Sequence, residues 1–131
     1  MYEKYFPTET EETLLKELVD CAFKVHKNIG PGLLERIYEV CFCHELKKKN
    51  IQYLSQVKIP IIYENIVFDE GFRIDVMVEN KIVCELKAVN DHLPVFEAQI
   101  LSYMKISKKH LGLLINFNVP LIKNGIKRFI I

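Results

Sequence analysis

The chain has 131 residues, of which half are hydrophobic and 27% are charged. This length is typical of one domain, residues 1–131, and so large a hydrophobic share excludes a disordered or low-complexity chain. Eighteen basic and 17 acidic residues leave a net charge of +1, which excludes the strongly basic class of proteins that coat nucleic acid. Because the sequence shows neither an apolar run of membrane-spanning length nor a secretory signal, we expect a cytoplasmic domain that does not enter a membrane.

Apolar residues that recur at helical spacing predict three helices. They span residues 10–28, 33–49 and 94–106. The segment Gly30-Pro31-Gly32 is expected to end the first helix. Gly30 suits a left-handed C-terminal cap, and a proline cannot continue the hydrogen-bond ladder of the helix.

Runs of β-branched and aromatic residues between turn formers predict five strands. They span residues 56–63, 66–78, 82–88, 111–117 and 125–131. Pro60 in the first run indicates an edge strand or a bulge, because proline cannot donate to a strand ladder. The order helix, helix, three strands, helix, strand, strand predicts an α/β fold in the broad sense (α+β), with a mixed sheet of four to five strands flanked by helices.

Four cysteines could in principle form disulfides or a metal site. They are Cys21, Cys41, Cys43 and Cys84. The sequence has no CxxC pair, and residues 41 and 43 of a helix point in different directions. We therefore predict buried free thiols.

The second and third predicted strands form a hairpin with a patterned register. If residues 79–81 form the turn, Val78 lies opposite Ile82, and Asp75 lies opposite Glu85. One face of the hairpin is then uniformly apolar, and the other is charged. The apolar face contains Ile74, Val76, Val78, Ile82, Cys84 and Leu86, and the charged face contains Arg73, Asp75, Glu85 and Lys87.

Two carboxylates opposed across a strand pair repel each other by roughly 3 kcal/mol at ~5 Å and an effective dielectric constant of ~20. A divalent cation between Asp75 and Glu85 would relieve this repulsion, and Mg²⁺ is a hard ion that binds one or two carboxylates. Lys87 could then hold an attacking water or offset charge on a phosphate. The alternative is an exposed polar sheet face on which Arg73 and Lys87 pair with the two acids.

Several of these residues resemble known motifs. Asp75 followed by Glu85-Leu86-Lys87 is similar to the D…(D/E)xK signature of the PD-(D/E)XK nuclease superfamily, and Gln99 with Tyr103 resembles the QxxxY motif of its RecB-like branch. The segment 32–38 matches the pattern that names the GxxExxY protein family, and the segment 114–128 is similar to that family's tail. The resemblance covers about residues 14–130.

This resemblance implies a restriction-endonuclease-like core with a Mg²⁺ or Mn²⁺ site. Asp75 and Glu85 would be metal ligands, and the backbone carbonyl of Leu86 would be a third. Lys87 would be the catalytic lysine, and Glu35 would be an additional acid that reaches the metal through water. Gln99 and Tyr103 would line the site. Ile74 departs from the pattern, because it stands where the superfamily's name has proline.

Without the resemblance, the same residues have simpler interpretations. Glu35 would be an acid in the first turn of its helix, where it interacts favourably with the helix dipole. Gln99 and Tyr103 are one helical turn apart and would form part of a helix rim.

The predicted function is therefore hydrolysis of phosphodiester bonds in nucleic acid by a divalent-metal-dependent nuclease. Whether the substrate is DNA or RNA stays open. The alternative is a noncatalytic module that retains the nuclease fold and binds nucleic acid or protein. A third idea is a homodimer in which each chain supplies half of a substrate channel.

Overall fold

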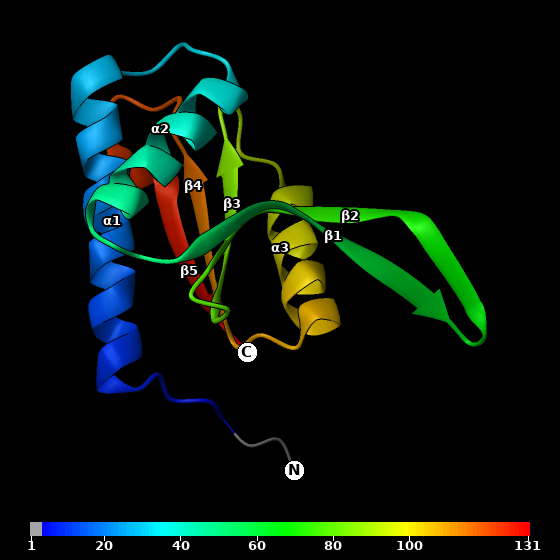
Figure 1. Cartoon of the computed structure of the whole chain (residues 1–131). Helices are drawn as coiled ribbons and strands as arrows, with labels where there is room; N and C mark the ends of the chain where they lie inside the picture. The colour runs from blue at the N-terminus through cyan, green and yellow to red at the C-terminus, as the bar shows by residue number, and fades with distance from the viewer. Residues whose placement is uncertain (1–3) are drawn as a thin grey trace.

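The computed structural model describes residues 4–131, with the side chain at position 70 left out. Two helices come first, then three strands, a third helix and two further strands (Figure 1). The helices are α1 (Glu9–Ile29), α2 (Glu35–Lys48) and α3 (Pro94–Ser107). The strands are β1 (Tyr53–Tyr63), β2 (Ile66–Val78), β3 (Ile82–Lys87), β4 (Leu111–Asn116) and β5 (Ile126–Ile130), and a short 3-10 helix, η1 (Ile122–Gly125), precedes β5.

The five strands form one mixed sheet in the order β1-β2-β3-β4-β5. β3 and β4 run parallel and are connected through α3, whereas all other neighbours are antiparallel. This confirms the predicted α/β class and the mixed sheet flanked by helices.

Local sequence explains where α1 begins and ends. The backbone N–H of Glu11 donates to the Thr8 hydroxyl at 3.1 Å, and the Thr8 N–H donates to the Glu11 carboxylate at 2.8 Å. This reciprocal capping box satisfies two of the free N–H groups at the helix start. Gly30 ends the helix with a φ of 66°, a conformation that L-residues with a side chain rarely adopt.

Two apolar clusters hold the helices on the sheet. The larger cluster lies between the sheet and the α1–α2 pair, where the rings of Tyr38 and Phe117 stack with centroids 4.7 Å apart. The smaller cluster lies under α3 and contains Ile100 and Met104. The helices therefore cover opposite faces of the sheet, as Figure 1 shows.

The first strand confirms the interpretation of Pro60. β1 is an edge strand, and its register with β2 shifts between Ile59 and Ile61, on either side of the proline. β1 begins at Tyr53, three residues earlier than predicted, because Tyr53 to Ser55 pair with the end of β2.

The β2–β3 register is confirmed in part. Val78 pairs with Ile82 and Val76 pairs with Cys84, but the recorded ladder ends there. Ile74 packs in the cluster under α3 instead of joining Leu86 in the larger cluster, so its predicted face was wrong. The cause lies at Asp75 and Glu85, whose carboxylates accept backbone hydrogen bonds across the two strands and so interrupt the regular ladder.

All four cysteines are free thiols. Cys21, Cys43 and Cys84 are buried as predicted, whereas Cys41 is only half-buried. Burial raises the pKa of the Cys21 thiol to about 11, which keeps it protonated and unreactive.

Candidate active site

Asp75 and Glu85 form an acid pair where β2 and β3 stop pairing regularly. The backbone N–H of Asp75 donates to Oε1 of Glu85 at 3.2 Å. The backbone N–H of Leu86 donates to Oδ2 of Asp75 at 2.9 Å. Each carboxylate is thus held by the backbone of the opposite strand, which keeps the two acids together.

Burial makes this pair electrostatically unusual. Glu85 is only 4% exposed, and burial together with repulsion from Asp75 raises its pKa to about 9. Burial also raises the pKa of Asp75. Within residues 4–131, no Lys, Arg or His forms an ion pair with either acid. The two acids therefore need a proton or a cation to offset their charge.

The sequence left two interpretations of the face that carries Arg73, Asp75, Glu85 and Lys87. The acids either bind a cation or pair with the two basic residues. Arg73 is exposed, and it makes no ion pair with Asp75 or Glu85 in the part of the chain that the structure describes. Lys87 is half-buried, and its Nζ lies 4.8 Å from the centre of the Phe96 ring in the first turn of α3. The ion pairs that the alternative interpretation required, from Arg73 and Lys87 to the two acids, are therefore not formed in the described chain.

Helix α2 brings two more carboxylates toward the pair. Glu35 is the first residue of α2, and its pKa is raised by partial loss of contact with water and by repulsion from Asp75. Glu39 lies one turn further along α2, and burial raises its pKa. Residues four apart share a helix face, so this spacing could have identified Glu39, which the sequence analysis missed.

Gln56 was also missed. Its side-chain amide donates to Oε1 of Glu39 at 2.6 Å and lies 3.5 Å from Oδ1 of Asp75. Gln56 has a positive φ of 52°, which interrupts the alternation of β1 opposite Asp75. No pattern in the sequence signals this interruption, because glutamine does not favour such a conformation.

Tyr38 positions the start of α2. Its hydroxyl donates to the carbonyl of Gly30 at 2.6 Å and accepts from the N–H of Leu33 at 3.1 Å. These bonds anchor the turn between α1 and α2, which places Glu35 at the site. In the 32–38 motif, the glycine therefore supplies the turn, with a φ of 97° at Gly32, and the tyrosine anchors it.

Helix α3 brings a tyrosine to the other side of the pair. Tyr103 is buried, and its ring lies 4.8 Å from that of Phe72. Burial, with repulsion from Glu85 and Asp75, raises the pKa of Tyr103 to about 12, so its hydroxyl stays neutral. Gln99 lies one turn earlier on α3 and is half-buried, and no hydrogen bond joins its side chain to the acids among the described residues.

The donor set fits a hard divalent cation. Among residues 4–131, no group of three His, Cys, Asp or Glu side chains is arranged to hold a metal ion by itself. Mg²⁺ nevertheless binds through one or two carboxylates and keeps several waters. The pair of buried Glu85 and half-buried Asp75, which has no ion-pair partner in the described chain, matches that requirement.

A cavity of about 420 Å³ opens beside Lys87. Phe96 and Asn116 line it together with His92, whose ring nitrogen lies 2.7 Å from Glu97. The same carboxylate of Glu97 accepts from Lys127 at 2.6 Å. Neither Asp75 nor Glu85 lines this cavity, so Lys87 is the residue of the predicted site that it shares, with further basic side chains along its wall.

Comparison with known families identifies the class of protein. The sequence matches the PD-(D/E)XK nuclease superfamily over residues 12–129. Because the match covers most of the chain, the protein belongs to this superfamily. No curated protein and no solved structure matches the chain.

None of the three helices in the described residues is both long enough and apolar enough to cross a membrane.

Proposed function

We propose that this protein is a divalent-metal-dependent nuclease that hydrolyses phosphodiester bonds in nucleic acid, and that it belongs to the GxxExxY group of its superfamily. The observation that carries this proposal is the Asp75–Glu85 pair, in which each carboxylate accepts a hydrogen bond from the backbone of the opposite strand and burial of Glu85 raises its pKa to about 9. Buried like charges without a cationic partner cost stability, and such strain is typical of functional sites. The superfamily match over residues 12–129 supports a nuclease over other metal-dependent enzymes.

The chain supplies oxygen ligands from both strands. Asp75 and Glu85 would bind Mg²⁺ or Mn²⁺ directly, with the backbone carbonyl of Leu86 as a third ligand. The hydrogen bond from the Leu86 N–H to Asp75 supports this assignment, because it brings that backbone to the carboxylate. Glu35 would act through a bound water. When bound, the ion would activate a water molecule and stabilise negative charge on the phosphate.

The remaining residues would bind and orient the substrate. Lys87 follows Glu85 by two residues on β3 and lines the cavity, where it would attract the scissile phosphate and stabilise the charge that develops on it. Tyr103 would donate a hydrogen bond from its neutral hydroxyl, and Gln99 would line the same wall. Gln56 and Glu39 would hold Asp75 in place.

The net charge of +1 favours a second candidate, a noncatalytic module that binds nucleic acid or protein. The complete set of Asp75, Glu85, Lys87 and Glu35 favours the nuclease, because a chain that had lost catalysis would not need to keep all four.

Calorimetric titration with Mn²⁺ tests the proposal before any substrate is known. We expect saturable binding of one or two ions per chain by the wild type and no binding by Asp75→Asn. Asp69→Asn is the matched control, because Asp69 is an exposed carboxylate on the same strand, and this variant should bind like the wild type. If the folded wild type bound no Mn²⁺, even with an oligonucleotide present, the noncatalytic module would be the better conclusion.

A cleavage screen follows, with single- and double-stranded DNA and RNA in Mg²⁺ or Mn²⁺. Cleavage by the wild type and its loss in Glu85→Gln would support the nuclease. Equal cleavage by both proteins would contradict the proposed site.

A further inference from the structure

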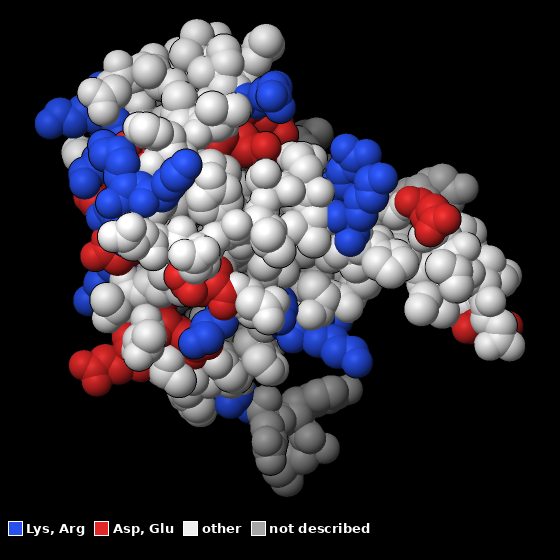
Figure 2. All heavy atoms as spheres, viewed as in Figure 1, with Lys and Arg blue, Asp and Glu red and all other residues white. Residues whose placement is uncertain are grey.

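A pair of basic residues lies where β1 and β2 leave the body of the protein. Lys58 on β1 pairs in register with Arg73 on β2, and both residues are exposed. Figure 2 shows a basic patch at this position, at the base of the two-stranded arm that extends from the body in Figure 1. No ion pair joins either residue to an acid among the side chains that the structure describes. Both charges are therefore free to meet a ligand.

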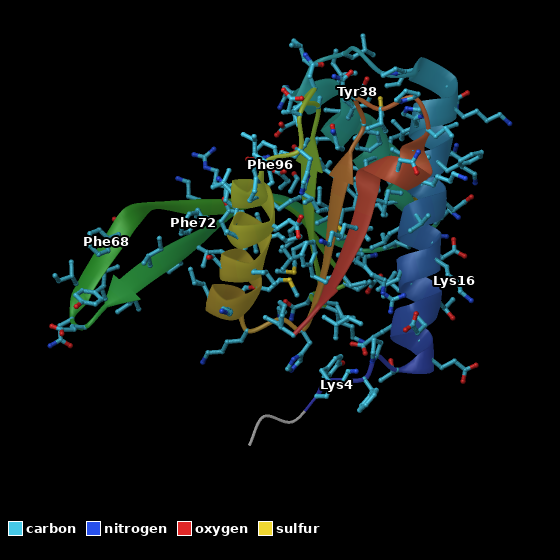
Figure 3. All side chains as sticks on the ribbon, turned by 180° about the vertical axis from the view of Figure 1, so that it is seen from behind. Lys4, Lys16, Tyr38, Phe68, Phe72 and Phe96 are labelled. Atoms are coloured by element: carbon cyan, nitrogen blue, oxygen red, sulfur yellow. The ribbon has the colours of Figure 1, made fainter. Side chains whose placement is uncertain are left out.

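Strand alternation shows which face of the sheet this basic pair occupies. The residues on either side of Lys58 and of Arg73 all pack with the cluster under α3, and these are Val57, Ile59, Phe72 and Ile74. Figure 3 shows Phe72 where β2 passes α3. Because successive side chains of a strand point to opposite faces, Lys58 and Arg73 point away from α3, toward the face that α2 covers.

The acids of the candidate site reach the same face. Asp75 lies two residues beyond Arg73 on β2, which corresponds to about 7 Å of strand. The side-chain amide of Gln56 lies 3.5 Å from Oδ1 of Asp75 and donates to Glu39 on α2. Glu35 lies one turn earlier on the same helix. The basic pair therefore borders these acids on the side of the arm.

A third cation lies at the start of α2. Arg36 directly follows Glu35, is exposed and makes no ion pair within the described chain. Figure 2 shows acidic surface between a basic patch at the start of α2 and the basic patch at the base of the arm. An acidic centre that binds a divalent cation, with positive charge on both sides, matches the charge of successive phosphates in one nucleic-acid strand.

The arm itself does not continue this basic surface. Residues 60–71 contain no Lys or Arg, and Glu64 and Asp69 are both exposed. A polyanion would be repelled there. The net charge of +1 provides no general attraction either, so binding of a phosphate backbone depends on local cations.

We propose that Lys58 and Arg73 bind backbone phosphates of a nucleic acid on one side of the scissile phosphate, and that Arg36 binds a phosphate on the other side. This inference rests on the proposed nuclease function and adds the path of the substrate, which runs past Asp75 and the base of the arm. Lys87, on the side of α3, would reach the scissile phosphate from the other face. Contacts to phosphates carry no sequence information, so the affinity should not depend on base sequence.

The salt dependence of oligonucleotide binding tests the proposal. Fluorescence anisotropy of a labelled strand, without divalent metal so that the strand stays intact, gives the slope of log K against log[NaCl]. Each phosphate contact contributes about 0.7 to this slope for a single strand and about 0.9 for a duplex. Lys58→Gln/Arg73→Gln should therefore reduce the slope by about 1.4 and 1.8, respectively, and Arg36→Gln by about half as much. Two unrelated base sequences should give equal slopes.

A matched control removes two charges elsewhere. Lys16→Gln/Lys47→Gln has the same net charge as Lys58→Gln/Arg73→Gln, and both lysines are exposed. Lys16 lies on α1 beside β5, at the opposite edge of the sheet from β1, and Lys47 lies in the last turn of α2. This control should keep the wild-type slope. All variants should keep the melting temperature and the Mn²⁺ affinity of the wild type, because the substituted side chains are exposed and lie outside the metal site.

Cleavage kinetics provide a second readout once a substrate is found. Lys58→Gln/Arg73→Gln should raise KM by about tenfold or more and change kcat by less than about twofold, because these contacts are the same in the bound substrate and in the transition state. Salt-dependent binding that this variant loses, in a protein that never cleaves, would support the inference and favour the noncatalytic module that binds nucleic acid.

Three results would overturn the inference. The first is a Lys58→Gln/Arg73→Gln variant that keeps the salt slope and the KM of an active wild type, and this result would leave the nuclease proposal intact. The second is an equal loss of slope in the control, because overall charge would then explain the binding. The third is a wild type that binds no oligonucleotide with or without Mn²⁺.

Discussion

The backbone N–H of Asp75 donates to the carboxylate of Glu85 at 3.2 Å. In a regular ladder this N–H would donate to a backbone carbonyl of β3. Here the side chain of Glu85 accepts the hydrogen bond instead. Two strands that exchange hydrogen bonds in this way keep both acids in the sheet although the acids repel each other. The resulting acid pair is the basis of the following predictions.

Neutralising either acid should remove metal binding and stabilise the fold. Glu85→Gln keeps an oxygen that can accept from the Asp75 N–H. It also removes the cost of protonating Glu85 on folding, because a carboxyl whose pKa is about 9 is protonated at pH 8 in the folded state and ionised in the unfolded state. One pKa unit corresponds to about 1.4 kcal/mol, so we expect the free energy of unfolding at pH 8 to rise by at least about 1 kcal/mol. Chemical denaturation and Mn²⁺ titration measure the two effects. If both Glu85→Gln and Asp75→Asn failed to fold, the acids would have a structural role instead.

The wild type should lose stability as the pH rises. Between pH 4.5 and about 9, folded Glu85 holds a proton that the unfolded chain releases, and Asp75 shifts in the same direction. Because the folded state binds more protons in this window, the free energy of unfolding falls with increasing pH. Denaturation from pH 5 to pH 9 should show this slope in the wild type and a smaller one in Glu85→Gln. An equal slope in both proteins would contradict the assignment to Glu85.

Metal binding should also depend on pH. A cation must displace the proton that the acid pair holds, so the apparent affinity for Mn²⁺ should increase from pH 6 to pH 9. Calorimetry in buffers of different ionisation enthalpy would show protons released on binding. Binding without proton release would mean that the ion occupies another site.

Lys87 should matter for cleavage and not for folding or metal binding. Its Nζ packs over Phe96 and forms no ion pair with the acids in the described residues. We expect Lys87→Met to bind Mn²⁺ and to lose cleavage by about 100-fold or more, because a charge that stabilises the transition state is removed. Lys109→Met is the control, because Lys109 lies two residues before β4 and outside the predicted site, and this variant should cleave normally. Cleavage by Lys87→Met at the wild-type rate would remove Lys87 from the mechanism.

Tyr38→Phe should loosen the start of α2. The variant keeps the ring that stacks on Phe117 but loses the hydrogen bonds to Gly30 and Leu33. We expect a loss of about 1–3 kcal/mol in the free energy of unfolding, together with weaker Mn²⁺ binding, because Glu35 is less well positioned. Tyr53→Phe is the control, since no hydrogen bond from the Tyr53 hydroxyl is found in the described chain. Unchanged metal affinity in Tyr38→Phe would separate Glu35 from the metal site.

Local sequence patterns were sufficient for the elements and for the acid pair. Helical periodicity located α1 and α3 to within one residue at each end, because caps and turn formers bound both helices. The alternation around the 79–81 turn brought Asp75 and Glu85 together, since residues that are neighbours in a hairpin are determined by strand period and turn length.

Only the tertiary structure showed which other residues lie beside Asp75 and Glu85. Glu39 and Gln56 come from α2 and β1, and their convergence on Asp75 depends on how α2 packs across the sheet. The need for glycine at position 125 was likewise not predictable from local sequence. An added Cβ there would collide with the carbonyl of Asn116, nine residues earlier in the chain.

The sequence by itself determined the order of the elements, the neighbouring acids and the free thiols, because these follow from the period of apolar residues and from local turn chemistry. Only the tertiary structure decided that Ile74 packs under α3, that Lys87 lies on Phe96 and that residues 60–71 extend away from the body. The physical reason is that each of these outcomes depends on which surfaces are left uncovered once the helices have packed. Which segments cover which surface depends on residues far apart in the chain, so no short stretch of sequence indicates it.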